Sequence, residues 1–226
     1  MLSRTAALLV PAFGPLRITS DPDADLAPGS IVAANHTSLG DPAVVLAALH
    51  RLGARPVVLA TAGLWRVPVL GRLLRHDGHI PVHRGTAHAA DALDRAAEAL
   101  AAGRIVLIYG EGGLPRRRDS GEQPPRPFRS GLARLATATG APVVPLGQAG
   151  SRRLTSGGPL KQLAGLATAP VRRPALHVHL GAPLRLTGDP AAATATAHAA
   201  VTAAWHHAAD RAADRATDRA TDRAAA

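Results

Sequence analysis

The stretch SIVAANHTSLGDPAVVLAALHRLG, residues 30–53, contains the signals that decide the fold of this chain. The apolar run at its start predicts a buried β-strand over Ser30–Asn35. Asp41 and Pro42 are typical of a helix start, with Asp41 as the N-cap and Pro42 in the first turn. The helix is expected to end before Gly53, because glycine often follows the last helical residue. The stretch therefore predicts a strand, a short loop and a helix.

The same alternation of strand and helix continues through most of the 226 residues. It predicts further strands at 55–61, 79–84, 105–109, 142–147 and 175–184, and helices at 63–75, 91–102 and 131–139. This pattern predicts an α/β fold in which a single domain has a central, mostly parallel or mixed sheet covered by helices. The intervening loop of about twenty residues before residue 131 is long for a compact domain, and such loops are usually functional.

The chain divides into four expected segments. Residues 1–29 are apolar but contain Pro and Gly, so this segment either covers the core or lies in a membrane interface as an anchor. Residues 30–188 form the α/β domain, and residues 189–209 predict an Ala-rich helix. Residues 210–226 repeat Asp-Arg-Ala, a low-complexity C-terminal tail without an apolar stripe. We expect this tail to be solvated and partly helical, with binding of a partner as the alternative.

Composition excludes several classes of protein. The chain has no cysteine, which excludes disulfide scaffolds, zinc fingers and cysteine nucleophiles. Its formal net charge is +10, and Lys161 is the one lysine among 26 basic residues. The excess of arginine lies in residues 51–84, 116–134 and 152–173, and arginine favours phosphate and carboxylate partners. Nucleic acid, a membrane surface and an acidic small molecule all fit, but an aromatic content of 2% argues against binding by base stacking.

The loop between the first strand and its helix contains a candidate catalytic pair. His36 and Asp41 would lie about 140° apart on a continuous helix and could not touch. Gly40 and the helix start at Asp41 make this span a turn, so the two side chains can converge. In such a pair the carboxylate holds one imidazole nitrogen, and the other nitrogen takes a proton from an alcohol. A structural aspartate cap beside a loop histidine is the alternative.

Four blocks occur in a fixed order along the chain. They are NHTSLGD at 35–41, LWRVPVLG and GHIPVHRG at 64–71 and 78–85, YGEGGL at 109–114 followed by Phe128 and Gly131, and APVVPLG at 141–147. In these blocks the chain resembles the lysophospholipid acyltransferase family, typified by the 1-acylglycerol-3-phosphate O-acyltransferases. The resemblance covers about residues 30–185, so residues 30–188 are expected to be an acyltransferase domain.

The resemblance implies transfer of a fatty acyl group from a thioester, acyl-CoA or acyl carrier protein, to the hydroxyl of 1-acylglycerol-3-phosphate, giving phosphatidic acid. It implies His36 as the catalytic base and Asp41 as the residue that orients it. The implied substrate-binding residues are Asn35, Ser38, Arg84, Glu111, Gly112 and Arg116. The enzyme is expected at the cytoplasmic face of the cell membrane, as a peripheral protein on an anionic surface, without a nucleic-acid partner.

The third block departs from the family pattern Phe-Pro-Glu-Gly-Thr-Arg. Gly113 stands in place of the threonine, and Leu114 stands in place of the arginine that the family uses on phosphate. The arginines at 116–118 could substitute for it. Another lysolipid, a glycolipid or a polyol is therefore an alternative acceptor. The alternative of another class is a non-catalytic basic module that binds membrane or nucleic acid.

Without cysteine and without a Gly-x-Ser-x-Gly motif, no nucleophile for an acyl-enzyme is evident, which favours direct attack by the acceptor hydroxyl. A thioester is already activated, so we expect no cofactor. His177 and His179, and the group His76, His79 and His83, lack a further ligand at suitable spacing. We therefore expect no metal site.

Overall fold

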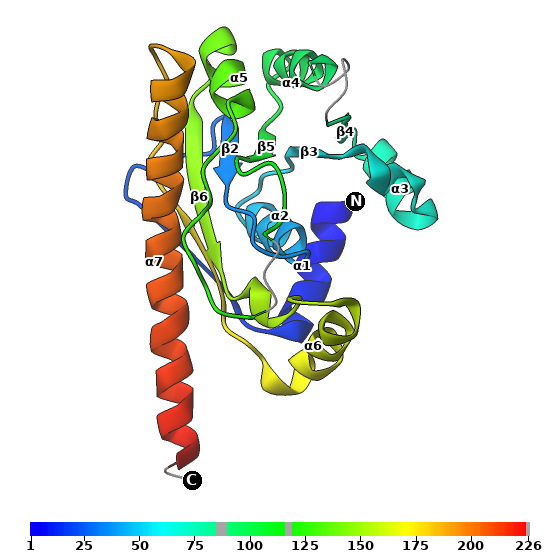
Figure 1. Ribbon diagram of the computed structural model, residues 1–226, viewed down its shortest axis with the longest axis vertical. Helices are drawn as coiled ribbons and strands as arrows, with labels where there is room; N and C mark the ends of the chain where they lie inside the picture. The colour runs from blue at the N-terminus through cyan, green and yellow to red at the C-terminus, as the bar shows by residue number, and fades with distance from the viewer. Residues whose placement is uncertain (85–89, 116–118, 225–226) are drawn as a thin grey trace.

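The computed structural model describes residues 1–84, 90–115 and 119–224, with side chains up to Ala213. In this part of the chain, one sheet has the strand order β1-β7-β6-β2-β5-β3-β4 (Figure 1). The strands are β1 (Leu16–Ser20), β2 (Ile31–Ala34), β3 (Val57–Thr61), β4 (Ile80–Val82), β5 (Val106–Tyr109), β6 (Val143–Ala149) and β7 (Leu176–Leu180). The helices are α1 (Leu2–Phe13), α2 (Asp41–Arg51), α3 (Pro68–His76), α4 (Asp91–Ala101), α5 (Gly131–Thr139), α6 (Pro159–Arg172) and α7 (Pro190–Ala224), with short 3₁₀ turns η1 (Ala62–Arg66) and η3 (Ser151–Arg153). The expected single α/β domain with a helix-covered sheet is confirmed.

The direction of the strands decides where their loops meet. β2 lies at the centre of the sheet and runs parallel to both of its neighbours, β5 and β6. β6 and β7 are antiparallel, and β1 is parallel to β7, so the sheet is mixed. Because the carboxyl ends of β2, β5 and β6 lie at the same edge, the loops that follow these three strands converge there.

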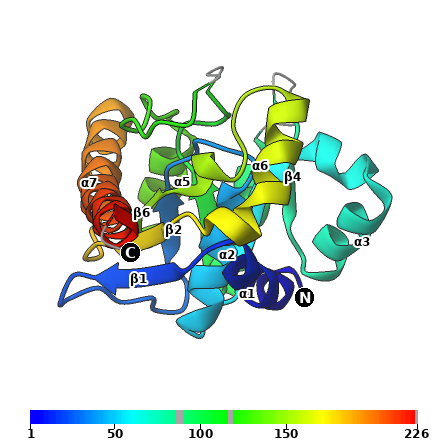
Figure 2. The same cartoon turned by 90° about the horizontal axis from the view of Figure 1, so that it is seen from below.

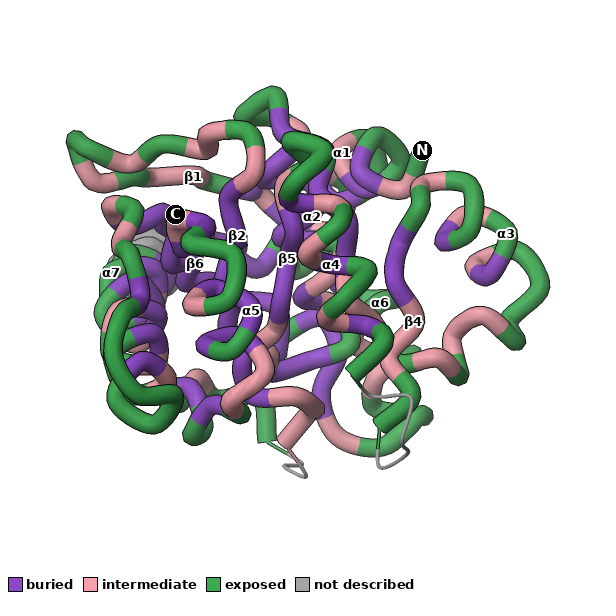
Figure 3. The backbone as a smooth tube through the Cα atoms, turned by 90° about the horizontal axis from the view of Figure 1, so that it is seen from above, coloured by how far each residue is buried: buried purple, intermediate pink, exposed green. Residues whose placement is uncertain are grey.

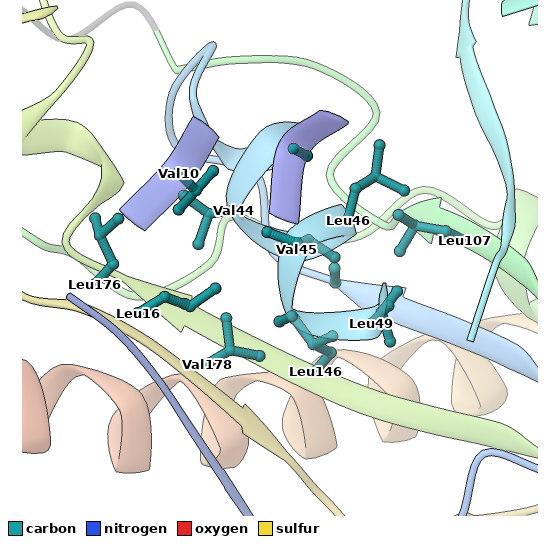
Figure 4. Packing of buried hydrophobic residues seen from close by; sticks show 14 of the residues in the cluster. Val10, Leu16, Val44, Val45, Leu46, Leu49, Leu107, Leu146, Leu176 and Val178 are labelled. Atoms are coloured by element: carbon teal, nitrogen blue, oxygen red, sulfur yellow. The ribbon is translucent and has the colours of Figure 1, made fainter. Parts of the chain in front are cut away.

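Alternate residues of the central strands face two layers of helices. Val32 and Ala34 of β2 belong to the apolar cluster under α1 and α2, whereas Ile31 and Ala33 belong to the cluster with α4, α5 and α7. Figure 4 shows the first cluster, in which Val10 of α1 and the apolar face of α2 pack on the strands. Figure 3 shows that burial is concentrated in the central strands and α2. These two layers hold β2, and with it the loop that follows, rigidly in the middle of the molecule.

α7 is the long helix that packs along β6 and β7 in Figures 1 and 2. Gly147 of β6 allows this close contact, because a Cβ at this position would overlap the backbone of Ala204. The backbone of α7 is helical through Ala224, so one continuous helix contains both the Ala-rich segment and most of the Asp-Arg-Ala repeat. Buried residues extend along it as far as Ala212. The first part of the repeat therefore still packs on the sheet.

The sequence pattern does not predict the two N-terminal elements, α1 and β1. Pro11 lies within α1 and removes one i→i−4 hydrogen bond, but the helix ends two residues later at Phe13, so the loss falls in its last turn. Gly14 then permits the turn into β1, since a Cβ there would overlap the backbone of Pro174. α1 covers the core with one face through Ala6 and Val10. Among the described residues, no helix is both long and apolar enough to cross a bilayer.

Two expected helix boundaries differ in the structure. The helix predicted over 63–75 is divided into η1 and α3 at Val67, whose φ of −76° and ψ of 117° are extended. The cause is Pro68, because a residue before proline is disfavoured from helical geometry. Gly40, rather than Asp41, is the N-cap of α2. The Asp41 carboxylate is thereby left for other partners.

Candidate active site

Three loops form the candidate site at the carboxyl edge of the sheet. The loop after β2 contains His36, the loop after β5 contains Glu111, and the loop after β6 contains Ser151. Hydrogen bonds from the first loop to each of the other two join them: the amide of His36 donates to Glu111 Oε1 at 2.8 Å, and Ser151 Oγ donates to Asp41 Oδ1. The strand order therefore assembles residues that are about 75 and 110 positions apart in the chain.

His36 and Asp41 meet as predicted. Their Nδ1 and Oδ2 atoms are 3.1 Å apart, and the Asp41 side chain is completely buried. The His36 ring stacks on Tyr109, with ring centroids 4.4 Å apart, and keeps 15% of its side-chain exposure. With Nδ1–H assigned as the donor to Asp41, the lone pair lies on Nε2, for which no protein partner exists among the described residues. The ring is thus fixed with one nitrogen available as a base.

Asp41 is the most heavily hydrogen-bonded group of the site. Besides His36, it accepts from the amides of Thr37 and Ser38, the latter at 2.9 Å, and from Ser38 Oγ at 2.7 Å and Ser151 Oγ. Burial raises the pKa of the Asp41 carboxyl, but the hydrogen bonds from His36, Ser151 and Ser38, together with the charge of His36, outweigh it and hold the pKa below its ordinary value. Asp41 is therefore ionised at neutral pH.

Asn35 and Ser38, predicted as substrate-binding residues, both face inward. The Asn35 side chain pairs with the backbone of Gln148 in β6, accepting from its amide at 2.8 Å and donating to its carbonyl at 3.1 Å. This pair continues the β2–β6 contact by one residue beyond the strand. Ser38 is bonded to Asp41, as described above. Both side chains hold the loop that presents His36.

Arg152 is buried, although arginine usually lies at the surface, and sequence reasoning does not find it. Its guanidinium donates to three backbone carbonyls: Thr37 at 2.7 Å, Gly121 at 3.0 Å, and Asp119. One side chain thus ties the long loop before α5 to the loop that contains His36. In the sequence, Arg152 is marked only by the excess of cations in residues 152–173, and that excess does not predict that its side chain is buried.

Glu111 is bonded to protein through both carboxylate oxygens. Oε1 accepts from the amide of His36, and Oε2 accepts from Arg126 Nε at 3.1 Å. Burial raises the pKa of Glu111 more than these bonds and the charge of Arg126 lower it. Arg126 also donates to the carbonyl of Gly113. Glu111 therefore links the third block to the loop that contains His36.

Arginines gather around Gly112 and Gly113. Arg129 covers Gly112. Glycine suits this position for two reasons: its φ of +65° is left-handed, and a Cβ would overlap the Arg129 side chain. Arg84 reaches the same place, with Nη1 3.4 Å from where a Cβ of Gly113 would lie. Partial burial lowers the pKa of Arg84, and so does the nearby charge of Arg129. Two exposed cations thus lie beside the third block.

Arg116, which was predicted to bind substrate, lies outside the described residues together with its neighbours at 117 and 118. Leu114 is described and is half-buried. The arginines that the structure places beside the third block are Arg84, Arg126 and Arg129. Arg84 was predicted; Arg126 and Arg129 were not, because their proximity depends on how the long loop folds back.

We predict that Asp41→Asn lowers the free energy of unfolding at pH 7 by at least about 1.5–3 kcal/mol, the range for hydrogen bonds to a charged group. Because the folded pKa of Asp41 lies below its ordinary value of 3.8, the stabilisation is complete above that pH and is lost as the pH falls through the lower folded pKa. The difference in the free energy of unfolding between wild type and Asp41→Asn should therefore become smaller below about pH 4. Urea unfolding at several pH values measures it. Asp94→Asn, an exposed position of α4, is the control, and a difference that does not change with pH contradicts the prediction.

Comparisons with known proteins identify the family and the fold. The family model described as "Acyltransferase" matches residues 17–148, a range that includes all four blocks. A search of curated proteins finds no match. Among solved structures, the chain is similar to the 1-acyl-sn-glycerophosphate (LPA) acyltransferase PlsC from Thermotoga maritima, with a TM-score of 0.69 and 17% identity, covering 91% of this chain and 77% of that one. At this identity, the similarity shows a shared fold.

The resemblance to lysophospholipid acyltransferases is thus confirmed by a match that does not depend on any single block. Because the family model spans more than half of the chain, the protein belongs to the acyltransferase family and is an acyltransferase.

Proposed function

We propose that this acyltransferase moves a fatty acyl group from a thioester, acyl-CoA or acyl carrier protein, to the free hydroxyl of 1-acylglycerol-3-phosphate, giving phosphatidic acid. The observation that carries the proposal is the His36–Asp41 pair, 3.1 Å apart, with His36 Nε2 directed away from its protein partner. The name of the Thermotoga protein of similar fold supports the choice of acceptor.

In the proposed reaction, His36 Nε2 takes the proton from the acceptor hydroxyl as its oxygen attacks the thioester carbonyl. The C–S bond then breaks, and the departing thiolate receives a proton from the imidazolium. Asp41, ionised and fully buried, stabilises the imidazolium and keeps the ring oriented. The thioester supplies the activation, so the reaction as proposed uses no metal or cofactor and no acyl-enzyme.

The acceptor's phosphate is proposed to bind on the β5 side of His36. Arg84 and Arg129 supply the charge there, and Gly112 leaves room for the Arg129 side chain. This pair would take the place of the family arginine that Leu114 replaces. Glu111 would shape the site through its bond to the His36 amide, since both of its oxygens are occupied.

We predict that His36→Ala lowers kcat for thiol release from acyl-CoA by about 10²–10⁴-fold, the usual contribution of a general base. Because the protein has no cysteine, a thiol-reactive dye detects released CoA without background. His50→Ala, in the last turn of α2, is the matched control and should keep wild-type activity. Equal activity of His36→Ala and wild type would exclude His36 as the base.

The acceptor assignment has its own prediction. Arg129→Gln should raise KM for 1-acylglycerol-3-phosphate about tenfold or more, because a charge-assisted contact to phosphate is lost. The same variant should change KM much less for a monoacylglycerol, which has no phosphate. Arg95→Gln, an exposed arginine of α4, is the control. Glycolipids and polyols are assayed as acceptors beside these two lipids. If wild type acylates one of them better than 1-acylglycerol-3-phosphate, the assignment of a phosphate-bearing acceptor is wrong, whereas the assignment of acyl transfer is kept.

We further propose that α1 and α6 form a membrane-facing surface at the cytoplasmic face of the cell membrane. Leu8 of α1 is 71% exposed and Leu160 of α6 is 81% exposed, and the two helices contact each other. Figure 2 shows them side by side. Leu163 and Val171 extend the apolar surface along α6. Exposed leucines beside arginines are suited to the headgroup layer of an anionic membrane.

The double substitution Leu8→Ser with Leu163→Ser should weaken binding to vesicles of phosphatidylglycerol and phosphatidylcholine by about tenfold or more, since apolar contact worth on the order of 1.4 kcal/mol or more is lost. Vesicle sedimentation measures the change. Leu52→Ser, at an exposed leucine that follows α2, should bind as wild type does. Undiminished binding of the double variant would rule out this surface.

A further inference from the structure

A basic cavity lies beside α6, apart from the arginines assigned to the acceptor. Its volume is about 590 Å³, within the usual range of small-molecule sites. Cationic and hydroxyl side chains line it together with a few small apolar residues, and none of its lining residues is a carboxylate. The polar lining residues are Arg153, Lys161, Arg172, Ser120, Ser156 and Thr168. A cavity with this lining attracts a small anion that accepts several hydrogen bonds.

The wall of this cavity is built by packing and hydrogen bonds. Lys161, Thr168 and Arg172 lie seven and four residues apart, which places them on one face of α6. Gly165, on the same face, allows α6 to approach the chain after η3, because a Cβ there would overlap the backbone of Leu154. Arg172 donates from Nε to Thr168 Oγ1 at 2.9 Å and from Nη2 to the carbonyl of Arg153 at 3.0 Å. Arg172 is therefore positioned before any ligand arrives.

The cavity adjoins the catalytic loop. Thr155, which lies between the lining residues Leu154 and Ser156, accepts a hydrogen bond from the Gly40 amide at 2.8 Å. Ser151, which begins η3, bonds to Asp41. The segment after β5 reaches the cavity as well, because Arg152 of η3 donates to the carbonyls of Asp119 and Gly121, and Ser120 between them is a lining residue. Arg84 and Arg129, the arginines of the proposed acceptor site, lie beside Gly113 and Gly112 and are not among the residues that line the cavity, so the two sites are separate.

We propose that this cavity binds the phosphate-bearing nucleotide end of a coenzyme A thioester donor. The inference rests on the proposed function, in which His36 must bring together two anionic substrates. The acceptor's phosphate is assigned to Arg84 and Arg129, so a separate cationic site beside the same histidine serves the other substrate. Coenzyme A has a 3′-phosphate and a diphosphate, which match three cationic side chains and the hydroxyls among them.

The first test measures binding without turnover. Adenosine 3′,5′-bisphosphate, the nucleotide portion of coenzyme A, should bind to wild type in calorimetry. Lys161→Gln and Arg153→Gln should each weaken this binding about tenfold, whereas Arg95→Gln should not. Lys161 is the one lysine of the chain, so an amine-selective reagent modifies it and the terminal amine alone. The bisphosphate should protect Lys161 from the reagent.

The second test measures donor selectivity. The ratio of kcat/KM for acyl-CoA to kcat/KM for the acyl thioester of N-acetylcysteamine, which lacks the nucleotide, should fall about tenfold in Lys161→Gln and stay unchanged in Arg95→Gln. If the bisphosphate binds and protects Lys161 but no acceptor supports thiol release, the cavity assignment stands and the proposed function fails.

Two results would overturn the cavity assignment. One is normal turnover of acyl-CoA without binding of the bisphosphate or protection of Lys161. The other is protection of Lys161 by phosphatidylglycerol vesicles and not by the bisphosphate, which would make the cavity a lipid headgroup site.

Discussion

The buried Asp41 carboxylate is the interaction on which the rest of the site depends. A carboxylate without water is costly unless its oxygens are hydrogen-bonded, and here groups of His36, Thr37, Ser38 and Ser151 supply those bonds. They come from its own loop and from Ser151, which lies beyond β6. Satisfying Asp41 therefore requires the loop after β2 and the loop after β6 to be in place together. The carboxylate held by these bonds also orients the His36 ring, so the stability of the loop and the orientation of His36 have one physical origin.

The order of the strands brings the loops after β2, β5 and β6 together at this centre. β2 presents His36 from the middle of the sheet, with β5 as one neighbour and β6 as the other. Arginines lie beside the third block, and a separate basic cavity lies between α6 and the chain that follows η3. The proposed reaction joins two anionic substrates, and two separate cationic sites suit it, because each substrate would bring its reacting group to His36 while its charge is held elsewhere. Arg152, bonded to three carbonyls, keeps the long loop against this centre.

Much of the fold follows from local pattern. Alternation of apolar runs with Ala/Leu-rich windows predicts the α/β class, and the predicted strands from β2 to β7 are present with shifted ends. α1 and β1 escape prediction because Pro11, Gly14 and Pro15 look like breaks, whereas the helix tolerates Pro11 near its end and β1 is held by pairing with β7. Asn35 and Ser38 belong to a recognisable motif, but their inward-facing roles depend on Gln148 and Asp41. Arg152 and Arg129 have no local signal, since an arginine's partners depend on chain segments distant in sequence.

The sequence by itself determined the class of fold, the acyltransferase blocks and the convergence of His36 with Asp41, because a turn of five residues is a local matter that Gly40 and Pro42 decide. Only the tertiary structure decided which groups satisfy Asp41, which arginines lie beside the third block, and that Ser120 and residues between 153 and 172 line one open cavity. The physical reason is that hydrogen-bond partners and cavities arise where separate strands end at a common edge. No single stretch of the chain contains that edge.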